Sequence, residues 1–134
     1  MAADGDIRVA CAAIVRDGGL LCVRKVGTGL FMLPGGKPEP GEDGLATLQR
    51  ELMEELGCAL RPGSARPLGR YAAPAAHEAG RTVHADVWLA DLSDTPRAQA
   101  EIAEIRWIGL HDPTAEPLLA PLLRTRVMPL LRRS

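Results

Sequence analysis

The chain has 134 residues, a common length for one domain, so residues 1–134 are expected to form a single domain. Apolar residues make up 46% of the chain and aromatic residues only 3%, which predicts a core of aliphatic side chains. The net charge of −1 gives no reason to expect binding to long DNA or RNA, and no apolar run is long enough to span a membrane.

The three cysteines are Cys11, Cys22 and Cys58. Their odd number and irregular spacing fit neither a disulfide framework nor a zinc site. The N-terminus has no basic-then-apolar targeting signal. Cysteines inside apolar strand-like runs suit a reducing compartment, so the expected location is the cytoplasm.

The first predicted elements form a β-hairpin. Residues 7–16 and 20–25 read as two strands, and Asp17–Gly19 between them has the composition of a tight turn. The apolar runs are nearly continuous, which is typical of strands that are covered on both faces. Arg24 and Lys25 end the second strand.

Residues 36–58 combine a loop with a helix. Pro38, Pro40 and two glycines exclude a regular helix in the first part. In the second part, Asp43 stands at an N-cap position and Gly57 at a C-cap position. Leucines recur between them at helical spacing and predict one buried stripe: Leu45, Leu48, Leu52 and Leu56.

Three carboxylates share a neighbouring face of this helix: Glu51, Glu54 and Glu55. Like charges three and four residues apart repel each other, and Arg50 can offset only part of that repulsion. A hard divalent cation such as Mg²⁺ would offset more of it, because Mg²⁺ binds carboxylate oxygens and keeps waters for substrate phosphates. The alternative is a solvated acidic helix face on a plain α+β domain.

Two further strands are expected after the helix, at 64–73 and 81–90, joined by a loop. Apolar and polar residues alternate in the second of them, which predicts one buried and one polar face. Trp88 falls on the polar face, either as a platform for a nucleobase or as a cover for the sheet. A last strand is expected near residues 101–108.

The tail from Asp112 reads as a helix with Pro117 in its first turn. Pro121 and Pro129 predict a kink or two short segments. The expected apolar face consists of four leucines: Leu118, Leu119, Leu122 and Leu123.

The stretch 36–58 resembles the signature of the Nudix hydrolases, the Nudix box. All seven fixed identities of the signature are present: Gly36, Glu42, Arg50, Glu51, Glu54, Glu55 and Gly57. The resemblance implies the family's fold, an α/β/α sandwich of the α/β (α+β) class. In that fold a mixed β-sheet lies between the box helix and a C-terminal helix.

The resemblance also implies a reaction, the Mg²⁺-dependent hydrolysis of a nucleoside diphosphate linked to another group X, with Mn²⁺ as a possible substitute. The implied metal ligands are the carbonyl of Gly35 and the carboxylates of Glu51, Glu54 and Glu55. Glu54 or Glu101 is the expected catalytic base, and Glu101 is preferred over Glu104. Arg50 is expected to orient the carboxylates.

Three residues are candidates for substrate binding: Arg24, Lys37 and Phe31. Arg24, together with Lys25, could contact substrate at the end of their strand, or both could be ordinary solvated charges. Lys37 could touch a phosphate or simply be exposed. Phe31 could stack on a base or lie in the core.

The compact length resembles that of MutT-type nucleoside triphosphate pyrophosphohydrolases, so a small nucleotide is the expected partner. Hydrolysis of ADP-ribose, nucleotide sugars or dinucleoside polyphosphates is the alternative. A nucleotide-binding module without catalysis is an alternative of another class. The sequence leaves open whether the chain is a monomer or a homodimer.

Overall fold

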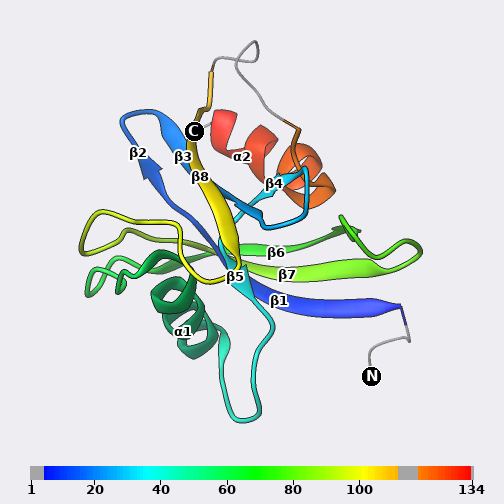
Figure 1. Cartoon of the computed structure of the whole chain (residues 1–134), viewed down its shortest axis with the longest axis horizontal. Helices are drawn as coiled ribbons and strands as arrows, with labels where there is room; N and C mark the ends of the chain where they lie inside the picture. Colours follow the sequence, from blue (N-terminus) through cyan, green and yellow to red (C-terminus); the bar gives the residue numbers. More distant parts are fainter. Residues whose placement is uncertain (1–4, 112–117, 134) are drawn as a thin grey trace.

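The computed structural model describes residues 5–111 and 118–133, and its first sheet has four strands in the order β5–β1–β7–β6 (Figure 1). These strands are β1 (Asp6–Ala13), β5 (Gly35–Gly36), β6 (Arg66–Pro74) and β7 (Thr82–Leu89). Strands β1 and β7 run parallel, whereas the other two pairs are antiparallel. The sheet is therefore mixed, as expected.

The second sheet is built on β3 (Gly19–Lys25). Three strands pair with it, all antiparallel: β2 (Val15–Arg16), β4 (Phe31–Met32) and β8 (Ile102–Gly109). The β2–β3 pair is the predicted hairpin, with its turn at Asp17 and Gly18. The strands are thus divided between two sheets, and the expected sandwich of helices around them is confirmed.

Helix α1 (Gly44–Leu56) has both predicted caps. The Asp43 carboxylate accepts a hydrogen bond of 2.8 Å from the Ala46 N–H. At the other end, Gly57 adopts a left-handed φ of 68° and donates its N–H to the Met53 carbonyl. Three of the four stripe leucines are fully buried, and Leu45 is partly buried.

Two apolar clusters lie on opposite sides of the strands, which explains the continuous apolar runs. Cys11 and Ala13 belong to the cluster under the C-terminal helical segment, whereas Ala12 and Ile14 belong to the cluster under α1. Figure 1 shows α1 and the C-terminal helix on opposite sides of the strands. Successive residues of a strand point to opposite faces, so a strand covered on both sides has few polar positions.

Trp88 covers the sheet and is not a base platform. It packs against the cluster under α1, and a Cβ on Gly44 would lie 3.2 Å from the indole Nε1. The alternation in residues 81–90 therefore does not produce a polar face at this end of β7, because the start of α1 covers it.

The C-terminal segment is divided in two, as its prolines predicted. A π-helical turn, η2 (Leu123–Val127), precedes the short helix α2 (Met128–Arg132). Pro129 has no N–H to donate, and the Met128 N–H bonds to the Leu123 carbonyl five residues back. Leu118 is 71% exposed, so its predicted place on the apolar face is wrong. Pro117 lies outside the described residues.

No helix in the described part of the chain is long and apolar enough to cross a membrane.

The core beneath α1 can be tested with two variants of neighbouring helix residues. Leu52 is fully buried, whereas Met53 is 50% exposed. Leu52→Ala should lower the free energy of unfolding by about 2–5 kcal/mol, because it leaves a cavity between the helix and the strands. Met53→Ala should change it by less than about 0.5 kcal/mol. Urea unfolding followed by circular dichroism measures both, and equal losses would contradict this packing.

Candidate active site

A pocket of about 810 Å³ lies where α1, the loop before it, the end of β3 and the residue before β8 meet. Its lining includes Glu51, Glu54 and Glu55 from α1 and Glu101 from the segment that leads into β8. The fold thus brings together four carboxylates that the sequence singled out, although one of them lies 46 residues further along the chain than its nearest neighbour in the sequence, Glu55.

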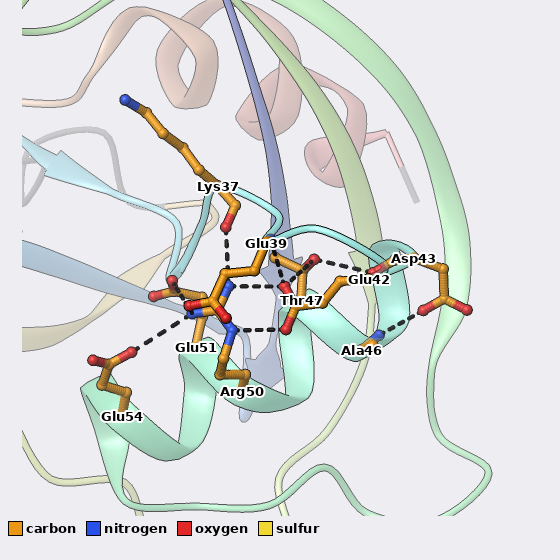
Figure 2. A network of polar contacts seen from close by, with 9 residues as sticks. All are labelled: Lys37, Glu39, Glu42, Asp43, Ala46, Thr47, Arg50, Glu51 and Glu54. Carbon is orange, nitrogen blue, oxygen red and sulfur yellow. Dashed lines mark hydrogen bonds and ion pairs between the residues drawn. The ribbon is translucent and has the colours of Figure 1, made fainter.

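Arg50 is the centre of a polar network beside this pocket (Figure 2). Its Nε and Nη2 donate to the two carboxylate oxygens of Glu42 at 2.7 and 2.9 Å. Nη2 also donates to the Lys37 carbonyl at 3.0 Å. One side chain of α1 therefore holds both ends of the loop that precedes the helix.

Glu42 is a structural residue of this network and does not line the pocket. Its carboxylate also accepts hydrogen bonds from the Glu39 N–H and the Thr47 hydroxyl. The bonds from Arg50, with these two, lower the pKa of Glu42 to about 2. The carboxylate therefore stays ionised at neutral pH and fixes the loop.

Arg50 also orients the carboxylates of the pocket. Its Nη1 donates to Glu51 at 2.8 Å and lies 3.7 Å from Glu54 (Figure 2). This geometry agrees with the expectation that Arg50 orients its neighbours, so its part is one of positioning.

Gly35 and Gly36 bring the backbone of β5 close to β1 and α1. A Cβ on Gly36 would lie 2.5 Å from the Glu51 carboxyl carbon, and one on Gly35 would lie 2.1 Å from the Ala10 carbonyl oxygen. Gly35 also has a φ of 148°, which favours glycine. Its N–H donates to Glu55 at 3.1 Å.

Glu55 is a buried carboxylate, only 7% exposed. Burial raises the pKa of Glu55 to about 7. The hydrogen bond from the Gly35 N–H and the positive charge of Lys25 lower this pKa, but by less than burial raises it. A bound cation would favour the ionised form, and three carboxylates are the hard oxygen donors that divalent cations prefer. The donor set therefore fits a divalent cation in its chemistry.

The carboxylates do not converge on a single point, however. Among the described residues, no three acidic, histidine or cysteine side chains are gathered closely enough to form a complete metal site. The guanidinium of Arg50 attracts Glu51 and Glu54, while Glu55 is held by the Gly35 N–H.

Glu101 and Glu104 differ in whether they line the pocket. Glu101 lines the pocket, and its carbonyl accepts a 2.8 Å hydrogen bond from the Val26 N–H. Glu104 does not line the pocket, because Arg106 at 2.8 Å and Arg24 at 3.3 Å hold its carboxylate. These contacts also lower the pKa of Glu104. The geometry favours Glu101, as the sequence did.

Two of the three substrate candidates are not brought into the site. Arg24 binds Glu104 and the Thr28 carbonyl, and does not line the pocket. Phe31 is 3% exposed and lies in the core under the guanidinium of Arg106. Lys37 does line the pocket.

Of the two charges at the end of β3, Lys25 lines the pocket, whereas Arg24, the one chosen as a candidate, does not. Neighbouring residues of a strand point to opposite faces, so only one of the two could face the pocket. The sequence did not show which one. Among the described residues, neither Lys25 nor Lys37 forms an ion pair.

The far end of the pocket is aliphatic, and sequence reasoning missed it. Val9 and Val83 contribute from the first sheet, and Leu122 contributes from the C-terminal segment. His77 and Glu78 of the β6–β7 loop add polar groups. No aromatic side chain is among the described lining residues.

A family model and a known protein both match most of this chain. A family model described as the NUDIX domain matches residues 6–130. A CTP pyrophosphohydrolase of Escherichia coli (strain K12) is 33% identical over 118 residues, which cover 84% of this chain and 82% of that protein.

Two solved structures resemble this chain over nearly its whole length. The crystal structure of a MutT NUDIX hydrolase from Burkholderia pseudomallei is 30% identical, with a TM-score of 0.74 and 96% of each chain covered. The solution structure of the E. coli ORF135 protein is 28% identical, with a TM-score of 0.71, and covers 96% of this chain and 91% of that one.

The close approach at Gly36 predicts a specific defect in cation binding. Gly36→Ala should displace the Glu51 carboxylate and weaken Mn²⁺ binding by about tenfold or more, because outer contacts that orient ligands commonly have effects of this size. Gly29→Ala is the matched control, since a Cβ there meets no atom within 4 Å. Titration calorimetry with Mn²⁺ measures both, and equal affinities for the two variants would contradict the assigned contact.

Burial of Glu55 predicts a pH-dependent stability in the metal-free protein. A folded-state pKa of about 7, against an ordinary value of 4.5, means that the folded state favours the protonated form. The associated stability is present below pH 4.5 and is lost as the pH rises through 7. Glu55→Gln should therefore stabilise the protein at pH 8, by at most about 3 kcal/mol, and much less at pH 5. Urea unfolding in EDTA tests this, and an equal gain at both pH values would show that ionisation is not the cause.

Proposed function

The chain belongs to the Nudix hydrolase family, and from this premise we propose that it hydrolyses a phosphoanhydride bond of a nucleoside triphosphate. More generally, the proposed substrate is a nucleoside diphosphate linked to a group X. The observation that carries the proposal is the lining of one pocket by the four carboxylates that the sequence singled out and by two lysines that form no ion pair within the described residues.

The pocket contains both positive and negative side chains, and the proposed reaction needs both. Lys25 and Lys37 present ammonium groups to a polyphosphate, whereas the Arg50 guanidinium in the same lining is already held by carboxylates. Lys25 takes the place that the sequence analysis gave to Arg24. The aliphatic residues of the lining would give a nucleoside apolar contacts.

The proposed chemical step is attack by a water on phosphorus. The new P–O bond forms as the P–O bond to the leaving phosphate or pyrophosphate breaks, and the proton of the water passes to a carboxylate. Glu54 and Glu101 are the candidates for this base, because both line the pocket. Arg50 positions Glu51 and Glu54 and does not take part in the step.

Enzymes of this family generally use divalent metal ions, and we propose Mg²⁺, with Mn²⁺ as a substitute. Glu51, Glu54 and Glu55, with the carbonyl of Gly35, are the residues that would hold it. When bound, the cation would supply positive charge to the non-bridging phosphate oxygens.

We propose a (d)NTP as the substrate and place CTP first, because a relative 33% identical to this chain is named as a CTP pyrophosphohydrolase. We further propose that residues 1–134 form one domain and that the enzyme works in the cytoplasm. Three buried free thiols, Cys11, Cys22 and Cys58, support the location.

The first experiment is a substrate panel with and without Mg²⁺. Pyrophosphate or phosphate release should be metal-dependent and fastest with one of the (d)NTPs. ADP-ribose, a nucleotide sugar and a dinucleoside polyphosphate complete the panel, and preference for one of them would replace the proposed substrate class. Nucleotide binding without turnover of any compound would indicate a binding module.

Three glutamine variants then test the proposed bases. Glu54→Gln and Glu101→Gln should each lower kcat, by roughly 10²- to 10⁴-fold for the residue that accepts the proton. Glu104→Gln is the matched control, since its carboxylate is held by Arg24 and Arg106 outside the pocket. Full activity in both Glu54→Gln and Glu101→Gln would refute the assignment of either residue as the base.

A further inference from the structure

Strand β8 has one edge that no strand covers. It pairs with β3 from Ile102 to Gly109, and with no other strand in residues 5–111 and 118–133. In Figure 1, β8 (yellow) lies in front of the other strands. An uncovered edge presents unpaired N–H and C=O groups and can pair with a strand of another molecule.

The outer strand of the first sheet, β6, has several features that protect it against such pairing, whereas β8 has one, close to its start. Strand β6 contains Pro67 and Pro74, and its register shifts between Pro67 and Gly69. The Arg126 guanidinium also donates a hydrogen bond to the carbonyl of Ala72 in β6. Strand β8 contains no proline, and its one irregularity is the extra residue Ala103 near its start.

The sequence of β8 is complementary to itself about Ile105. Glu104 and Arg106 on either side of it carry opposite charges, and Ala103 and Trp107 are both apolar. Ile102 and Ile108 follow at the next positions. In an antiparallel pair related by a two-fold axis at Ile105, Ile105 faces its own copy and Glu104 faces Arg106, and these central facing pairs are favourable.

Exposed groups lie along this edge. The side chains of Glu104 and Arg106 are 36% and 48% exposed, and Trp107 is 38% exposed. On the β3 side of β8, and so not at the uncovered edge, Val26 donates its N–H to the carbonyl of Glu101 and is 66% exposed. Both apolar residues are among the few large ones at the surface of the described chain.

We propose that two copies of this chain form a two-fold symmetric dimer by antiparallel pairing of β8 with β8, with Ile105 on the axis. Glu104 of each copy faces Arg106 of the other, in addition to the ion pair of 2.8 Å that the two residues form within one chain. The pairing joins the second sheets of both copies into one continuous sheet. It uses no residue that lines the pocket, so it does not rest on the proposed function.

Sedimentation velocity over a concentration series tests the dimer, from about 1 µM to about 500 µM because a single strand pair gives a modest affinity. The wild-type chain should change from monomer to dimer within the series. Glu104→Arg and Arg106→Glu should each shift the midpoint at least tenfold upward, since like charges then face each other. Arg66→Glu on the exposed part of β6 is the control and should leave the midpoint unchanged.

Mixing the two charge variants gives a sharper test. The Glu104→Arg chain carries arginine at both positions and the Arg106→Glu chain carries glutamate at both. In a mixed pair the arginines of one copy would face the glutamates of the other, so the heterodimer should form where neither variant dimerises alone. The double variant Glu104→Arg/Arg106→Glu should dimerise with itself, because opposite charges face each other again. Circular dichroism confirms that each variant is folded.

A wild-type chain that stays monomeric throughout the series overturns the proposal. So does a dimer whose midpoint is the same in Glu104→Arg as in the wild type, because the register about Ile105 would then be wrong. Absence of the heterodimer from a mixture of two folded variants has the same meaning.

Discussion

The contact between Arg50 and Glu42 is the interaction on which the site depends. Both oxygens of Glu42 accept hydrogen bonds from the guanidinium, and the same guanidinium binds the Lys37 carbonyl and Glu51. Only a planar group with several fixed donors can hold a carboxylate, a carbonyl and a second carboxylate at once. The loop before α1 contains two prolines and has no regular structure of its own, so this side chain fixes its path.

Helix α1 couples this network to the core. Leu48 and Leu52 pack on the strands, and Glu51 and Glu55 leave the same helix toward the pocket. The directions of the carboxylates are therefore set by the packing of the leucines and not by a flexible loop. In the absence of a cation, burial of the ionised Glu55 carboxylate lowers the stability of the folded protein. A carboxylate placed for cation binding thus destabilises the scaffold that holds it.

Local patterns in the sequence predicted the elements that depend on local interactions. The caps at Asp43 and Gly57 and the divided C-terminal segment are of this kind. The face to which a side chain points was harder to predict. Whether Arg24 or Lys25 faces the pocket, and whether Trp88 is exposed, depends on how strands pair and on what covers them, and the residues responsible are distant in the sequence.

The same reasoning explains why the proposed reaction was easier to predict than its substrate. Of the four pocket carboxylates that the sequence singled out, three lie within five residues of one helix, where helical spacing alone places them on one face. The aliphatic end of the pocket is assembled from β1, the β6–β7 loop and the segment before η2, which no spacing rule connects. If the proposed nucleoside binds against these segments, selectivity depends on their relative positions. His77 and Glu78, which the β6–β7 loop adds to the lining, are both exposed.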